Sequence, residues 1–438
     1  VSVAACGGRT TTHVDEVVPG VSEVLAAQRY AWSSAERQRA ISEGRALIER
    51  HQCNRCHVID DVPASSRPTH CVSCHVFLDG LDATDHAFTT IASRYGQAVI
   101  ERYQRNIEHF VAVPDLTLVA KRLRPEWIAR FVRDPHDLRP LMDETMVRTV
   151  VSEAEARVIA TYFAAIANVA PPREGDVPEL GPRPTRARVA EGERLFRERA
   201  CNTCHTVGNI PTGKTESELR AVGVAARLAP NLRFTRERLD RDVVVAWIRD
   251  PHAFASSTLM PNLSVTARDA SRLADFILFA DPRLLAIPTP DLTLPPAVER
   301  PVSYEEMKER VLGRVCVHCH MNDHERDPGP GNEGGFGYPG RDLSMRTYEM
   351  LVAGALSPAH IGDGGLGARV SVLEPGPDGV PPILSSMLRR RAETPRDLVR
   401  AFRDHPVPAR RDASLGMPMG LPPMDDEAFW ILRAWIEQ

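Results

Sequence analysis

Four copies of one short motif, Cys-x-x-Cys-His, constrain this chain more than any other feature of its sequence. Two thiols three residues apart in a tight helical turn point to the same side, and the next residue places an imidazole beside them. Such a unit holds a flat ligand through two sulfurs and presents a nitrogen to a metal at its centre. The motif residues are Cys53, Cys56 and His57; Cys71, Cys74 and His75; Cys201, Cys204 and His205; and Cys316, Cys319 and His320.

These motifs predict four covalently attached haem c groups, with the motif histidine binding each iron. A single Cys-x-x-Cys pair is also typical of a zinc half-site or a redox disulfide. Four pairs, each followed at once by histidine, are specific for c-type haem attachment. No other metal needs to be invoked to explain them.

The ninth cysteine, Cys6, stands apart from the motifs. The sequence Val3-Ala-Ala-Cys6-Gly resembles a bacterial lipoprotein processing site, so we expect Cys6 to be lipidated and residues 1–33 to be a signal remnant and a tether. The protein would then be held at a membrane from the periplasm or the cell surface without spanning the bilayer. The alternative is a free thiol on a flexible terminus.

Composition limits the other possibilities. A net charge of −4 gives no argument for nucleic acid as a partner, and no apolar stretch approaches the length of a membrane-spanning helix. Aromatic residues make up only 6% of the chain, whereas proline occurs 36 times in 438 residues. This combination favours small helical domains joined by extended linkers.

An internal repeat appears when the chain is aligned on its motifs. Glu43-Gly44 and Glu191-Gly192 precede the first and third motifs at the same distance. Pro114-Asp-Leu and Pro230-Asn-Leu follow them, and the tetrapeptide Arg-Asp-Pro-His comes later in both copies. These last two landmarks lie 116 residues apart (114 to 230 and 133 to 249), and a Trp-Ile pair, at 127 and 247, leads into each tetrapeptide.

The copies differ most after the motif histidine. Pro114 follows His57 by 57 positions, whereas Pro230 follows His205 by 25, so the extra 32 residues accommodate the second motif. We therefore predict an all-α chain of three tandem domains, the first with an extra haem in an insertion. The predicted boundaries are a dihaem domain at 34–168, a proline-rich linker at 169–187, a monohaem domain at 188–283, a second linker at 284–300 and a monohaem domain at 301–438.

Residues 188–281 resemble a class I cytochrome c domain, through the third motif, Pro230-Asn-Leu, Trp247-Ile and Leu259-Met260-Pro. The resemblance implies that Met260 is the second axial ligand of that haem. The first domain has Asp-Glu-Thr-Met146 in the same place, which implies Met146. The last domain has Met417-Pro-Met-Gly-Leu-Pro-Pro before a helix with tryptophan, which implies Met417, with Met419 and Met424 as alternatives.

No methionine lies near the second motif, so its haem is expected to take a histidine as second ligand. His109, at the end of a predicted helix, is the first choice and His86 the second, with His51 and His70 weaker. His318, inside the fourth motif, is interpreted as a filler or surface residue.

Three His/Met haems and one bis-His haem would make an electron carrier, because six-coordinate iron exchanges an electron with little rearrangement. The resemblance implies electron transfer between redox partners outside the cytoplasm, in or beside a respiratory or photosynthetic complex. The alternative is a peroxidase-like or sulfur-oxidising multihaem enzyme with an open haem at Cys71–His75. The lipid-anchored tetrahaem subunit of photosynthetic reaction centres is similar in haem count, but there the ligand methionines precede the motifs.

Overall fold

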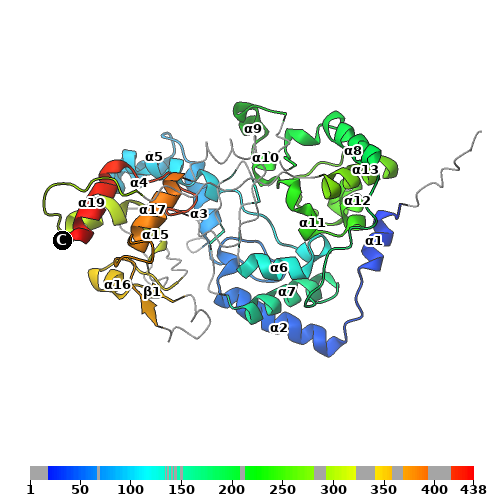
Figure 1. The fold of residues 1–438 in the computed structure, drawn as a ribbon, viewed down its shortest axis with the longest axis horizontal. Coiled ribbons are helices and arrows are strands. Elements are labelled where there is room, and N and C mark those ends of the chain that lie inside the picture. Colours follow the sequence, from blue (N-terminus) through cyan, green and yellow to red (C-terminus); the bar gives the residue numbers. More distant parts are fainter. Residues whose placement is uncertain are drawn as a thin grey trace, which may run out of the picture.

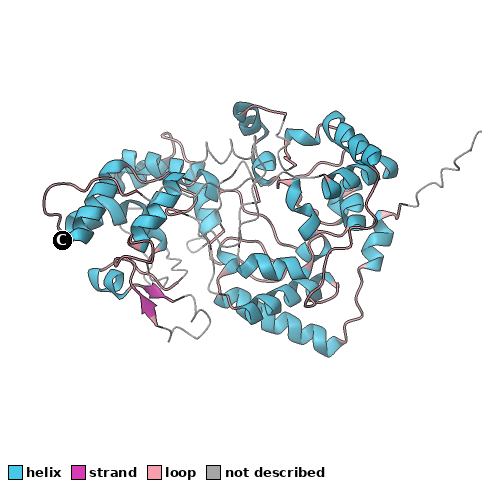
Figure 2. Ribbon diagram, in the orientation of Figure 1, coloured by secondary structure: helices cyan, strands magenta, loops and turns pink. Residues whose placement is uncertain are grey.

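The computed structural model describes residues 18–66, 70–133, 135, 138–139, 142, 146–147, 151–207, 213–280, 293–321, 341–357, 368–392 and 416–438 (Figure 1). These residues are mostly helical (Figure 2). In the described part, the strands are the two-residue β1 (Ala355–Leu356) and β2 (Arg369–Val370), which pair antiparallel. The predicted all-α class is confirmed.

The helices follow the repeat. Helix α1 (Val21–Ala27) lies in the segment expected to be a tether and packs against a helix of the second unit, α12 (Arg241–Arg249). The first unit contains α2 (Ser34–Arg50), η1 (Cys53–Arg55), α3 (Cys71–Asp79), α4 (His86–Tyr95), α5 (Gln97–Asn106), η3 (Glu108–Phe110), η4 (Val119–Lys121), α6 (Pro125–Arg133) and α7 (Glu153–Ala167). The second contains α8 (Arg186–Glu198), η5 (Cys201–Thr203), α9 (Glu216–Val222), α10 (Val224–Leu228), η6 (Leu232–Phe234), α11 (Thr235–Arg238), α12 (Arg241–Arg249), η7 (Pro251–Ala253) and α13 (Ala267–Phe279). The third contains α14 (Tyr304–Met307), the π-helical η8 (Lys308–Cys316), α15 (Val317–Cys319), α16 (Tyr348–Ala353), α17 (Pro382–Ala392) and α19 (Asp426–Glu437).

Side-chain caps start the long helices of both repeats. Ser33 begins α2 and Ser152 begins α7, and each hydroxyl accepts a hydrogen bond from the backbone N–H three residues later. Thr185 and Thr266 do the same for α8 and α13. Such a cap satisfies one of the backbone donors that a helix leaves unpaired at its N-terminus.

The repeated Glu-Gly landmark marks a close helix crossing. The first and last helices of each unit pack against each other, α2 on α7 and α8 on α13. Gly44 lies against Tyr162, and Gly192 lies against the backbone carbonyl of Arg272 and the side chain of Phe276. Because a Cβ atom at either glycine would overlap these atoms, only glycine permits the crossing.

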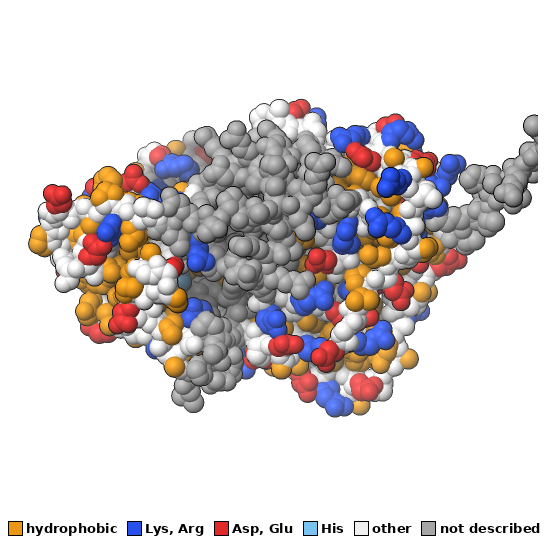
Figure 3. Space-filling model, in the orientation of Figure 1, with side chains coloured by type: hydrophobic (Ala, Val, Ile, Leu, Met, Phe, Trp, Pro, Cys, Tyr) orange, Lys and Arg blue, Asp and Glu red, His pale blue; other side chains and the backbone are white. Residues whose placement is uncertain are grey.

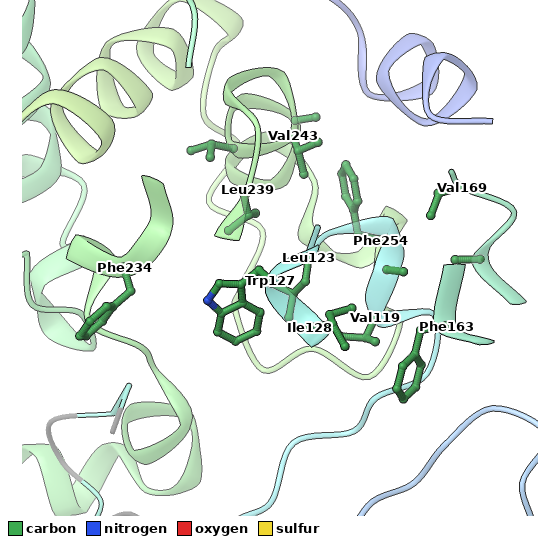
Figure 4. Close-up of a cluster of buried hydrophobic side chains, with 14 of the residues drawn as sticks. Val119, Leu123, Trp127, Ile128, Phe163, Val169, Phe234, Leu239, Val243 and Phe254 are labelled. Atoms are coloured by element: carbon green, nitrogen blue, oxygen red, sulfur yellow. The ribbon is translucent and has the colours of Figure 1, made fainter. Parts of the chain in front are cut away.

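The first two units share one apolar core, whereas the third unit has a core of its own. Figure 4 shows part of the shared core, with Trp127 and Phe163 from the first unit and Phe234 and Phe254 from the second. Buried apolar area is the main source of folding free energy. We infer that the first two units stabilise each other.

The linker at 169–187, expected to be an extended spacer, is fixed to both of these units. Asp176 forms an ion pair with Arg124 of the first unit, at 2.7 Å. Glu179 accepts a backbone hydrogen bond from Arg241 of the second unit, at 2.9 Å, and its own N–H donates to Asp240. The chain therefore holds the two units in contact along this segment. Most of the linker at 284–300 lies outside the described residues.

The close crossing at Gly192 predicts a specific loss of stability. We expect Gly192→Ala to lower the free energy of unfolding by about 1–3 kcal/mol, because the carbonyl that its Cβ would meet belongs to helix backbone and cannot rotate away. Thermal or urea unfolding of the two proteins measures the change. Gly80→Ala is the matched control, since Gly80 is exposed and no atom lies within 3.4 Å of its Cβ position. An equal loss in both variants would contradict the crossing argument.

Candidate haem-binding sites

Three of the four motif histidines are held in the same way. In each, Nδ1 lies within hydrogen-bond distance of a backbone carbonyl oxygen. The pairs are His57 with Pro114 at 2.9 Å, His205 with Pro230 at 2.9 Å, and His320 with Leu343 at 3.2 Å. A carbonyl only accepts a hydrogen bond, so this contact puts the proton on Nδ1 and leaves the lone pair of Nε2 for a metal.

This contact explains the repeated Pro-x-Leu landmark. The sequence shows that Pro114 and Pro230 stand at equal positions in two repeats, but not what they do. In the structure each proline supplies the carbonyl that orients a motif histidine. The third unit supplies the same carbonyl from Leu343, so the position of the oxygen matters and not the proline ring.

Burial keeps these imidazoles neutral. It lowers the pKa of His57, His205 and His320, and the carbonyl at Nδ1 opposes part of that effect in each. The charge of Arg139 lowers the pKa of His57 further, and that of Arg238 does so for His205. Neutral imidazole is the form that binds a metal, so these three residues are ready to act as ligands near pH 7.

The backbone of the first and third motifs forms a tight turn that gathers the two thiols and the imidazole. The short helices η1 and η5 contain these motifs, and the N–H of the histidine bonds the carbonyl of the first cysteine. The residue before each turn, Gln52 or Ala200, has a left-handed backbone with φ of 56°. This conformation is uncommon outside glycine, and both repeats adopt it at the same place. None of the eight motif cysteines forms a disulfide bond within the described residues.

The second motif has a different local structure. It starts the regular helix α3, and His70 caps that helix by accepting a hydrogen bond from the N–H of Ser73, at 3.0 Å. His75 is buried, and burial lowers its pKa to about 3, with a further contribution from the charge of His318. The backbone of Phe110 opposes this shift. Burial therefore keeps this histidine neutral as well, and a backbone hydrogen bond with Phe110 takes the place of the carbonyl contact in the other three motifs.

Three motifs that are distant in the sequence lie close together. The thiols of Cys56 and Cys71 are hydrogen-bonded, which lowers the pKa of Cys71 and raises that of Cys56. Burial raises the pKa of Cys319, and the nearby Cys71 raises it further. The hydroxyl of Tyr103, on α5, lies 3.2 Å from Nε2 of His318. The first, second and fourth motifs thus lie close to one another.

The candidate methionine ligands differ in their surroundings. The indole N–H of Trp247 donates to Sδ of Met260 at 2.9 Å, so this thioether is held in place by a residue of the same repeat. Met417 is 38% exposed, Met419 is partly exposed, and Met424 packs against the core of the third unit. Met146 is partly buried.

The candidate histidines of the insertion also differ. His109 lies in η3 and is partly buried, whereas His86 is exposed at the start of α4. Nε2 of His51 lies 3.5 Å from a carboxylate oxygen of Glu155. The ring of His318 lies near the ring of His75, with the ring centroids 6.3 Å apart. From the sequence alone, His318 is interpreted as a filler or surface residue.

Two arginines at equal repeat positions cross between the first and second units. The guanidinium of Arg122 lies over the ring of Trp247, at 5.3 Å, and that of Arg238 lies over Trp127, at 4.9 Å. The Nε atom of each arginine is buried, and neither has a hydrogen-bond partner among the described residues. Burial, together with the charge of Arg139, lowers the pKa of Arg122 to about 10, and Asp115 opposes part of this shift. Burial, together with the charges of Arg122 and Arg139, lowers the pKa of Arg238 to about 9.

The sequence analysis missed this arginine pair, although its signal was present. Arg122 and Arg238 are 116 residues apart (122 to 238), the same spacing as the Pro-x-Leu landmarks. Burying a cation is costly unless an anion compensates its charge. The carboxylate of Asp115 compensates part of the charge of Arg122, and two such cations at one interface favour the binding of a further anionic group. Nearby, Ser257 of the second unit donates to Asp115 of the first, at 2.7 Å, and joins the units beside the motif histidines.

Comparison with family models, with curated proteins and with solved structures found no significant match for this chain. In the described part of the chain, none of the helices combines the length and the apolar character that crossing a bilayer requires. The same residues contain no cluster of three or more His, Cys, Asp or Glu side chains arranged to hold a metal ion by themselves. Cys6 lies outside the described residues.

Proposed function

We propose that this protein is a tetrahaem c-type cytochrome that transfers electrons between redox partners outside the cytoplasm. The observation that carries the proposal is the repeated arrangement of Cys-x-x-Cys-His with a backbone carbonyl at Nδ1, at His57, His205 and His320. It presents two thiols and one metal-binding nitrogen in the same geometry three times. The units would be cytochrome c-like domains, the first of them with a second haem in its insertion.

The residues present fit haem c. Bound haem would supply a redox-active iron, and each motif would attach it through two thioethers and one imidazole. Thioether ligands raise the reduction potential relative to imidazole. Met260, Met146 and Met417 would complete three of the sites. Met260 has the strongest support, because the Trp247 N–H occupies one side of its sulfur and leaves another lone pair for the iron.

A bound haem would also carry carboxylate groups, and cationic side chains at the interface between the first two units would pair with them. Arg122 and Arg238 have buried guanidinium groups, near His57 and His205 respectively by position in the repeat, and the charge of Arg238 acts on His205. Propionate groups at this interface would neutralise both arginines. They would also bring the haems of the first and third motifs toward one another.

The proximity of the motifs gives an order for the proposed haems. The contacts of Cys71 with Cys56 and Cys319 link the fourth, second and first motifs, and the arginine interface links the first to the third. The resulting order in space is fourth, second, first, third. A continuous series of this kind suits electron transfer from one end of the molecule to the other.

We further propose that lipidation of Cys6 holds the protein at a bacterial membrane on the periplasmic or outer side. The partners would be a redox protein or a membrane complex that gives and takes electrons. Side chains of both charge signs cover the second unit in Figure 3, whereas hydrophobic side chains gather over the third unit. Opposite ends with different surfaces suit two different partners.

Haem content tests the proposal directly. Protein produced in a host that attaches haem c should carry four haems, measured by intact mass and by the reduced-minus-oxidised spectrum. Replacing Cys201 and Cys204 together with alanine should leave three, because the covalent links of one haem are gone. A wild-type protein without covalent haem would overturn the proposal.

Removal of a methionine ligand should change one haem only. We expect Met260→Ala to turn one of four low-spin haems high-spin and to lower its potential, because the thioether that favours reduced iron is lost. Electron paramagnetic resonance with a redox titration measures both. Met350→Ala is the control, since Met350 also accepts a hydrogen bond at its sulfur, from Ser344 at 3.2 Å, but is not at a proposed ligand position. An unchanged spectrum for Met260→Ala would show that another group binds this iron.

The buried arginines should raise the potential of the haems beside them, because a nearby cation favours the added electron. Arg238→Gln should therefore lower the potential of the haem on His205 while all four haems stay low-spin and attached. Arg194→Gln is the control, because Arg194 pairs with Glu198 on the exposed surface. Identical potentials in the two variants would mean that Arg238 does not face a haem.

A further inference from the structure

We propose that His318, the residue inside the fourth motif, is the second axial ligand of the haem attached at Cys71, Cys74 and His75. The fourth motif would then serve two haems at once: Cys316, Cys319 and His320 for its own, and His318 for its neighbour. This inference rests on the proposed function, because it concerns the haem of the second motif.

The distance between the two rings carries the inference. The ring centroids of His75 and His318 are 6.3 Å apart, and the ring planes are inclined by 33°. A metal–imidazole bond is about 2.0 Å long and a ring nitrogen lies about 1 Å from its ring centre, so imidazoles on opposite sides of one ion have centres about 6 Å apart. The two histidines thus have the separation that a shared iron requires.

The groups around His75 favour His318 as the second ligand. His75 is also in edge contact with Tyr103, at 6.3 Å, and with Phe110, at 5.7 Å. Phenylalanine has no ligand atom, and the hydroxyl of Tyr103 lies 3.2 Å from Nε2 of His318. A ligand histidine usually hydrogen-bonds through one ring nitrogen and binds the metal through the other. Tyr103 provides His318 with that second contact at Nε2, so Nδ1 is the nitrogen that would bind the iron.

The arrangement explains why the fourth motif lies against the insertion. His318 sits between the two cysteines that attach one haem while its ring binds the iron of the next. The electron would therefore pass between these haems through a few bonds of one short loop. The third unit has its own apolar core, and this ligand bond would fix it to the first unit at the point where electrons cross.

Replacing His318 tests the proposal. We expect His318→Ala to keep all four haems attached and to turn one of them from low-spin to high-spin. His318→Met should restore a low-spin haem at a higher potential, because thioether replaces imidazole. Intact mass gives the haem count, and electron paramagnetic resonance with a redox titration gives the spin state and the potential.

The controls separate this proposal from the alternatives. Val317→Ala changes the neighbouring position of the same motif and should leave four low-spin haems, so it shows whether disturbing this loop is enough. His109→Ala and His86→Ala should also leave the spin states unchanged. Four low-spin haems in His318→Ala, with a high-spin haem in His109→Ala, would overturn the inference and leave the proposed function intact. A wild type without four covalent haems would instead overturn the proposed function itself.

Discussion

The hydrogen bond between a motif histidine and a backbone carbonyl is the contact on which the rest of each site depends. The motif alone can bring two thiols and a ring together, but it does not fix which ring nitrogen carries the proton. The carbonyl fixes it, and it comes from a segment 57 residues away in the first unit and 25 in the second. The crossing of the first and last helices at Gly44 and Gly192 closes each of these two units around its site. In each unit, the fold therefore places one backbone carbonyl oxygen beside Nδ1 of the motif histidine.

Much of this could be predicted from the sequence, because the motifs and helices are local patterns. Repeated landmarks such as Glu-Gly and Pro-x-Leu also showed which positions matter, though not what they contact. The pairing of Arg122 with Trp247 and of Tyr103 with His318 could not be predicted, because these residues come from different units and no local pattern records their contact. Within its own motif, His318 looks like a filler residue. Its significance depends on an insertion more than 200 residues earlier in the chain.

Burial of charge distinguishes the two junctions of the molecule. Between the first and second units, buried guanidinium groups raise the cost of the interface unless an anion lies between them. Between the insertion and the third unit, rings meet instead: the imidazoles of His75 and His318, the phenol of Tyr103 and the phenyl ring of Phe110. The first junction suits the negatively charged edge of a haem, and the second suits the apolar faces around an iron. A haem would thus contact the protein through its negatively charged edge at the first junction and through its apolar faces at the second.

The order of the motifs in space gives the second haem a special position in the proposed series. Although it is an addition to the repeat, its Cys71 lies close to Cys56 of the first motif and to Cys319 of the fourth. Two imidazole ligands would give this haem a lower potential than neighbours with thioether ligands. Electron transfer from a neighbouring haem to this one would then be energetically uphill, and the next transfer along the series would be downhill. Such a step limits the flow without stopping it when the neighbouring haems are close. The insertion would therefore connect two parts of the molecule and also set the rate at which electrons pass between them.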